Sequence, residues 1–246
     1  MIKDYFIFDG VSSADFNVIV DSADVFGKPA VGLSTVKIPG RSGDLLIYDN
    51  RMENVNISYQ CHCDYRFRSR LDNLVMELAS RRGYKRLEDS VYPGHFRRAY
   101  FQGPVGAKLL RTYRAGSFKV DFNADPRKFL KAGEMPEKYT VNGSIYNPTL
   151  FTAEPLIYLY GTAGGSGAFN IKGNQQINVT FPQSGTIIID SELGEAYDTN
   201  GASLNSSVSF AASNTAQDFP RIEPGENAVL MWNLSSVVII PRWWQI

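Results

Sequence analysis

The chain has few of the residues on which most catalytic and metal sites depend. Its 246 residues include two histidines, His62 and His95, and two cysteines, Cys61 and Cys63. Nucleophile–base catalysis needs a serine or cysteine beside a histidine, and no Gly-x-Ser-x-Gly elbow fits a strand-to-helix turn here. We therefore expect a protein that is not an enzyme, with no catalytic residues, no cofactor-binding residues and no cofactor.

Long apolar runs are also missing. The first ten residues, MIKDYFIFDG, lack the apolar core of a signal peptide, and no run approaches the roughly 20 apolar residues that span a membrane. The composition, 43% hydrophobic and 20% charged, is that of a folded soluble protein. We expect a chain made in a cytoplasm, with no membrane partner.

The two cysteines do not predict a metal site. From Val55 to Cys63, apolar and polar residues alternate strictly, which predicts a strand with one buried face. On such a strand Cys61 and Cys63 point to one face and His62 to the other, so the three cannot converge on one metal ion. Two buried thiols beside a surface histidine are the favoured interpretation, and no metal ligands are expected.

The densest acidic group consists of Asp190, Glu192, Glu195 and Asp198. Two carboxylates facing across a cleft could hydrolyse a glycoside, and carboxylates with carbonyl groups could bind calcium, although the spacing is not that of an EF-hand. The turn-like segment SELGEAYDTNG favours solvated loop carboxylates over both functions.

Aromatic side chains of the second half raise the possibility of sugar binding. Tyr197 and Trp232 could stack on a sugar ring if they lie exposed on a β-sandwich. The alternation of apolar residues around Trp232 favours a place in the core instead.

Charge is distributed unevenly although the net charge is zero. Residues 1–133 contain 21 Lys and Arg against 15 Asp and Glu, whereas residues 134–246 contain 4 against 10. Residues 66–114 alone contain 12 Lys and Arg against 4 Asp and Glu. These basic residues do not form one stripe, so specific nucleic-acid recognition is not expected. The asymmetry favours two domains with different neighbours, 1–133 and 134–246.

The first domain is organised around residues 36–83. Two strands joined by the turn Pro39–Asp44 precede the alternating strand, and together they are expected to form one packing unit with a following helix over about 64–82. Asp64 is the expected cap and Gly83 the expected terminator. Residues 21–33 are expected to form a loop or arm that could clasp a neighbouring subunit.

The second domain has the pattern of an antiparallel sandwich. Eight short strands with turns between them are expected at 156–160, 168–172, 176–181, 186–190, 196–198, 208–210, 228–232 and 237–240. The Gly- and Pro-rich stretch 132–155 is expected to be a junction between domains.

Three pieces of the sequence carry a family resemblance: VKIPGRSGDLLIYDN, GTIIIDSELGEAYDTNG and DFPRIEPGENAVLMWNLSSVVIIPRWWQI. They resemble the distal tail protein of long, flexible-tailed bacteriophages. The resemblance implies a mainly β fold with a ring-forming N-terminal domain and a galectin-like C-terminal β-sandwich. It leaves open whether the last residues, Pro241–Ile246, return to the first domain.

The resemblance also implies a function at the distal end of the phage tail, in the virion. Six copies would form a ring, alone or stacked on a second ring, that joins the tail tube protein to the tail-associated lysin or hub protein. Peripheral receptor-binding proteins would attach to it, and DNA would pass through its lumen. The basic residues of 66–114 are then expected to face protein partners or solvent. The alternative function is a carbohydrate-binding adhesin that acts through the C-terminal sandwich.

Overall fold

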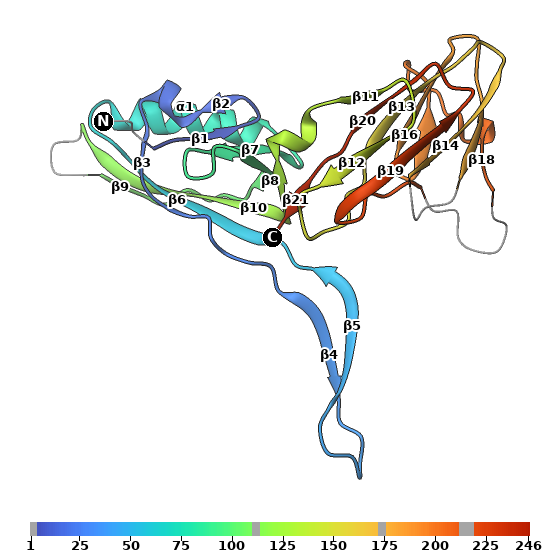
Figure 1. Ribbon diagram of the computed structural model, residues 1–246. Helices are drawn as coiled ribbons and strands as arrows, with labels where there is room; N and C mark the ends of the chain where they lie inside the picture. The colour runs from blue at the N-terminus through green and yellow to red at the C-terminus, as the bar shows by residue number, and fades with distance from the viewer. Residues whose placement is uncertain (1–3, 110–113, 172–175, 212–218) are drawn as a thin grey trace. The chain divides into compact units, whose positions relative to one another are not determined.

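The computed structural model describes residues 4–109, 114–171, 176–211 and 219–246 (Figure 1). The chain forms two compact units, residues 1–128 with Ile246, and residues 129–245. Each unit has its own hydrophobic core. The boundary between the two units follows residue 128, within the strand Gly116–Leu130.

The first unit is a mixed structure of one main antiparallel sheet, one helix and a separate hairpin. The sheet has the strand order β2-β1-β7-β8-β10-β6-β3, and β9 also pairs with β10. Its strands are β1 (Phe6–Phe8), β2 (Val11–Ser12), β3 (Ile19–Asp24), β6 (Val55–Cys63), β7 (Lys85–Asp89), β8 (His95–Phe101), β9 (Ala107–Leu109) and β10 (Gly116–Leu130). A 3₁₀ turn, Ser13–Phe16, lies between β2 and β3. The sequence of 108–114 also predicts a strand, and residues 110–113 of it lie outside the described residues.

Strand β6 alternates as the sequence predicts. Its apolar side chains are buried and its polar ones are exposed or half-buried. The neighbouring strand β10 matches this pattern, with Val120 opposite Tyr59 and Phe122 opposite Ile57. Tyr59 stacks on Phe6 with 4.9 Å between the ring centroids. Aromatic rings from three strands therefore form the centre of the first core.

Helix α1 (Phe67–Ser80) covers this core with Phe67, Leu74 and Leu78, all buried. The helix is the expected one, but its ends differ from the prediction. The N-cap is Arg66, in the left-handed conformation, and Asp64 makes no cap. At the other end Arg81 is the C-cap and Gly83, though left-handed with φ +76°, lies beyond it.

The sequence Asp125-Pro126 favours a break in secondary structure, because the residue before a proline is restricted, yet strand β10 runs through it. Its pairing with β6 ends at Ala124, so Pro126 is not required to donate a hydrogen bond to that strand. The fixed φ of proline is compatible with an extended chain, and β10 continues to Leu130.

The second unit is a sandwich of two five-stranded antiparallel sheets. Their orders are β11-β20-β13-β16-β17 and β12-β19-β14-β15-β18. The strands are β11 (Glu137–Tyr139), β12 (Gly143–Asn147), β13 (Leu156–Tyr160), β14 (Ser166–Ile171), β15 (Ile177–Thr180), β16 (Thr186–Asp190), β17 (Glu195–Tyr197), β18 (Val208–Phe210), β19 (Gly225–Trp232) and β20 (Ser236–Ile240). Two 3₁₀ turns, Lys131–Glu134 and Asn205–Ser207, complete the unit.

All eight expected strands of this unit are present, and two more lie where a junction was expected. Strands β11 and β12 fall inside 132–155, each at the edge of a sheet. Glycine and polar residues suit edge strands as well as loops, because only one side of such a strand is paired. Composition alone therefore could not distinguish these two strands from loops.

The C-terminal residues pack against the start of the second unit. Trp243 is buried in the sandwich core, and its carbonyl oxygen accepts from the backbone N–H of Leu130 at 2.9 Å. A Cβ atom on Gly133 would lie 2.3 Å from the Trp243 nitrogen, so only glycine allows this approach. Strand β21 (Trp244–Gln245) follows and pairs with β10.

Replacing Leu74 with aspartate is expected to unfold the first unit. The substitution places a carboxylate among buried apolar side chains, which we expect to destabilise the unit by about 4 kcal/mol. Met76→Asp is the matched control, because Met76 lies on the same helix with 63% of its surface exposed. Thermal unfolding followed by circular dichroism should show a large loss for Leu74→Asp and little change for Met76→Asp. A cooperatively folded Leu74→Asp protein with an unchanged Tm would contradict the assigned core.

Candidate assembly site

A hairpin of β4 (Val31–Val36) and β5 (Leu45–Met52) is the most exposed apolar element of the first unit. The two strands form a sheet of their own, and Figure 1 shows them as a long ribbon that extends beyond the main sheet of this unit. The connecting residues 37–44 include Gly40 and Gly43, both with positive φ. This hairpin replaces the expected packing unit: β4 and β5 do not join β6 and α1.

The hairpin has apolar side chains on both faces. Opposite residues share a face, and the register places Leu33 opposite Tyr48 and Thr35 opposite Leu46 on one side. The other side has Val36 opposite Leu45 and Ser34 opposite Ile47. Leu46 is 50% exposed and Tyr48 is 57% exposed.

Such a ribbon leaves apolar side chains and backbone edges without cover from its own residues. A two-stranded hairpin is marginally stable at best in water, and its outer edges present unpaired backbone groups. Within the described residues, its apolar side chains remain exposed on both sides. The sequence signal was the run Leu45–Tyr48, which has no polar alternation and therefore predicts burial on both faces.

The basic residues of 66–114 have several different roles. Arg81 pairs with Glu77 at 2.6 Å, Arg86 pairs with Glu88, and Arg70 lies over the ring of Tyr65. Arg97 is buried. No single basic face is expected from such a distribution.

The two thiols lie where the sequence placed them. Cys61 and Cys63 are buried, and His62 faces the other side, with its Nδ1 2.6 Å from Asp21 Oδ1. Burial raises the pKa of the Cys61 thiol to about 12, and it also raises that of Cys63. Thiols in such surroundings are poor nucleophiles.

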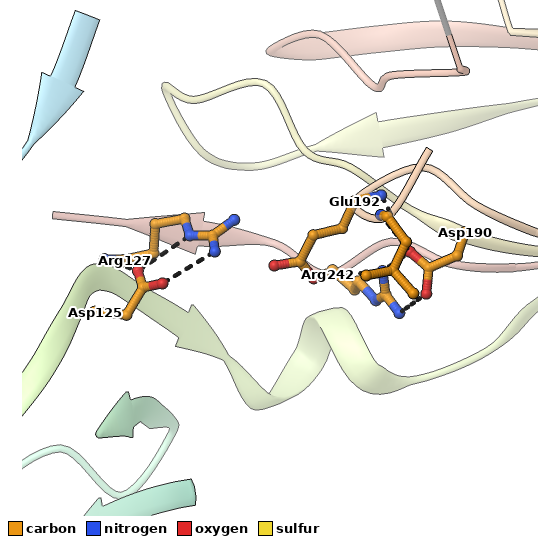
Figure 2. A network of polar contacts seen from close by, with 6 residues as sticks. Asp125, Arg127, Asp190, Glu192 and Arg242 are labelled. Atoms are coloured by element: carbon orange, nitrogen blue, oxygen red, sulfur yellow. Dashed lines mark hydrogen bonds and ion pairs between the residues drawn. The ribbon is translucent and has the colours of Figure 1, made fainter. Parts of the chain in front are cut away.

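Asp190 is not a solvated loop carboxylate, as the sequence suggested for the acidic group. Asp190 is buried at the end of β16, and both its oxygens accept hydrogen bonds from Arg242, at 2.7 and 2.9 Å (Figure 2). Glu192 Oε2 lies 3.5 Å from the same guanidinium group. The distant Arg242 could not be recognised as the partner from the sequence around Asp190.

The remaining members of the group are separated. Asp198 Oδ1 accepts from the backbone N–H groups of Asn200 and Ala202, both at 2.8 Å, and so shapes an exposed turn. Glu195 is exposed at the start of β17. Among the described residues no group of three or more His, Cys, Asp or Glu side chains is placed to hold a metal ion.

Trp232 is not a core residue, contrary to the sequence interpretation. It is 43% exposed at the end of β19, whereas its neighbour Met231 is buried. The apolar alternation was read correctly as a strand, but Trp232 falls on its outer face. Tyr197 is half-buried.

In the described part of the chain, no helix has the length and apolar character needed to cross a membrane.

Two solved phage structures share the fold. The chain matches the SPP1 Dit protein, described as a paradigm of the hub adsorption apparatus in phages that infect Gram-positive bacteria, with a TM-score of 0.77 and 14% identity over 99% of each chain. It matches a chain of the phage P2 baseplate in its activated conformation with Ca, with a TM-score of 0.55 and 11% identity over 97% of each chain. No family model matches, and no curated protein matches in sequence.

These matches cover both units and confirm the expected fold: mainly β, with one helix, in the arrangement of a distal tail protein. The expected resemblance is thus confirmed at the level of the fold. At such low identities the fold is all that the comparison establishes.

The Asp190–Arg242 pair is expected to make the second unit sensitive to acid. Burial alone would raise the pKa of Asp190, but the hydrogen bonds and charge of Arg242 outweigh it and hold the pKa below its ordinary value. The carboxylate therefore stabilises the fold above the unfolded pKa of about 4, and this stabilisation is lost as the pH falls through the folded pKa. Asp190→Asn should lower the free energy of unfolding at pH 7 by about 3 kcal/mol, because it leaves Arg242 without its main partner.

The free energy of unfolding, measured by urea unfolding between pH 3 and pH 7, tests the role of the Asp190–Arg242 pair. Glu195→Gln is the control, because it removes an exposed carboxylate of the same segment. The difference in free energy of unfolding between the wild type and Asp190→Asn should become smaller as the pH falls, while Glu195→Gln should have the same pH dependence as the wild type. An equal gap at all pH values would show that the pair does not control the acid response.

Proposed function

We propose that the chain is a structural subunit of a phage tail tip, in which copies assemble into a ring through the first unit. The observation that carries this proposal is the β4–β5 hairpin, whose two apolar faces lie exposed within a distal-tail-protein fold. A closed ring repeats one heterologous contact, so each subunit needs a projecting element and a surface that receives it. The hairpin supplies the projecting element.

A ring of six copies is the proposed assembly, alone or stacked on a second ring, as the family resemblance implies. Each hairpin would lie between two neighbouring bodies, because one neighbour can cover only one of its faces. The outer edge of β2, or of β3 beyond the bridge between Val20 and Asp4, offers a sheet edge to which a strand can add.

The ring would join the tail tube protein to the tail-associated lysin or hub protein at the distal end of the virion tail. Its lumen would let DNA pass, and receptor-binding proteins would attach at its periphery. The proposed domains are a ring-forming domain of residues 1–133 and a galectin-like sandwich of residues 134–246. Support comes from the likeness to the SPP1 hub protein and the phage P2 baseplate chain.

No catalysis is part of this function. The buried thiols have raised pKa values, and the buried Asp190 carboxylate is paired with Arg242. Both arrangements support a stable shape rather than a reaction.

Light scattering after size exclusion tests the assembly. The wild-type protein should have six or twelve times the mass of one chain, and the double variant Leu46→Asp/Ile47→Asp should be a monomer. The two aspartates place charge on opposite faces of the hairpin, so any apolar cover on either face is lost. We expect the assembled fraction to fall at least about tenfold, the effect of roughly 1.4 kcal/mol.

Leu150→Asp is the control, because Leu150 is an exposed apolar residue of the second unit. It should assemble like the wild type, and all variants should keep the wild-type circular dichroism. A wild-type protein that stays monomeric at high concentration would overturn the proposal, as would a hexamer formed by the hairpin double variant.

A further inference from the structure

The outer face of the second sheet of the sandwich presents one continuous row of side chains. The register places Trp232 opposite Ala168, Ala168 opposite Asn178, and Asn178 opposite Ser209. Directly opposed residues project from the same face of a sheet, so these four lie in one line across β19, β14, β15 and β18. The residues that alternate with them, including Met231, Phe169 and Val179, are buried in the core.

A hollow lies along this row. It has a volume of about 300 Å³ and is lined by Trp232, Ala168, Asn178 and Ser209, together with Ser166 and Thr180 from the next pair of residues. The small side chains of β14 leave room beside the indole, so Trp232 forms one wall and polar groups form the other. The volume is at the low end of the range for ligand sites, about 300–1,000 Å³.

We propose that this hollow binds one ring of an uncharged saccharide. A pyranose ring has an apolar C–H face, which packs on an aromatic side chain, and an equatorial rim of hydroxyl groups, which needs donors and acceptors. Trp232 provides the aromatic wall. Asn178, Thr180 and Ser209 provide an amide and two hydroxyl groups on the opposite side.

The polar wall is partly ordered before a ligand binds. Gln176 Nε2 donates to Asn178 Oδ1 at 2.8 Å, which orients the amide within the row. Groups that are already oriented lose less conformational entropy on binding.

The lining also selects the charge of the ligand. None of the described residues that line the hollow is charged. An anionic sugar or a phosphate would find no cation there to offset the cost of removing its charge from water. A neutral hexose or N-acetylhexosamine carries no charge and does not have this cost. The hollow is open and small, so one site should bind in the millimolar range.

The site is independent of the proposed ring. In a ring of six copies, however, six such sites would bind a repetitive polysaccharide far more tightly than one site does, because later contacts become intramolecular.

The test measures binding of methyl glycosides of glucose, galactose and N-acetylglucosamine, with sialic acid as the anionic probe. Protein-detected NMR titration of the wild type should show saturable shifts with at least one neutral glycoside and none with sialic acid. Trp232→Ala should weaken the binding at least tenfold, and Trp232→Phe should retain most of it, because a ring remains for stacking.

Tyr146→Ala is the matched control. Tyr146 is a 67% exposed aromatic residue on β12 of the same sheet, away from the row. It should bind like the wild type, and every variant should keep the wild-type Tm. Absence of binding to all three neutral glycosides would overturn the proposal. Binding that Trp232→Ala leaves unchanged, or a preference for sialic acid, would overturn it as well. A Trp232→Ala variant that loses a protein partner while no neutral glycoside binds would assign the row to a protein contact instead.

Discussion

The constraint on which the proposed assembly depends is the burial of the β4–β5 hairpin. Apolar side chains lie on both of its faces, and a two-stranded ribbon cannot cover both from its own residues. The hydrophobic effect therefore favours association wherever a second copy can supply the cover. An exposed apolar edge can cause uncontrolled aggregation, because association buries its surface. When the same contact is repeated around a closed ring, association stops at a defined number of copies.

The rest of the chain provides rigid bodies for such a contact. In the first unit, α1 and the rings around Tyr59 make a dense core on one sheet. In the second, two sheets enclose a separate core that Trp243 completes. Within these bodies the two thiols are buried, and Asp190 is paired with Arg242.

The secondary structure could be predicted largely from the sequence, because alternation and helical spacing are local properties. β6, α1 and all eight expected strands of the sandwich are present. The errors arose where composition was ambiguous or where a partner was distant. β11 and β12 lie in a stretch whose glycines and prolines were taken for a junction. Asp190 was taken for a solvated residue. Trp232 was placed in the core because a strand pattern gives the period but not, at the end of a strand, which face is covered.

The sequence by itself determined the class of the fold, since burial patterns of period two and near four depend only on neighbouring residues. It also carried the resemblance to distal tail proteins that the fold then confirmed. The tertiary structure alone decided which surfaces remain open: the two faces of the hairpin and the Trp232 row. It alone paired Asp190 with Arg242, 52 residues away. Exposure and pairing depend on elements brought together by folding, and no local pattern of residues contains that information.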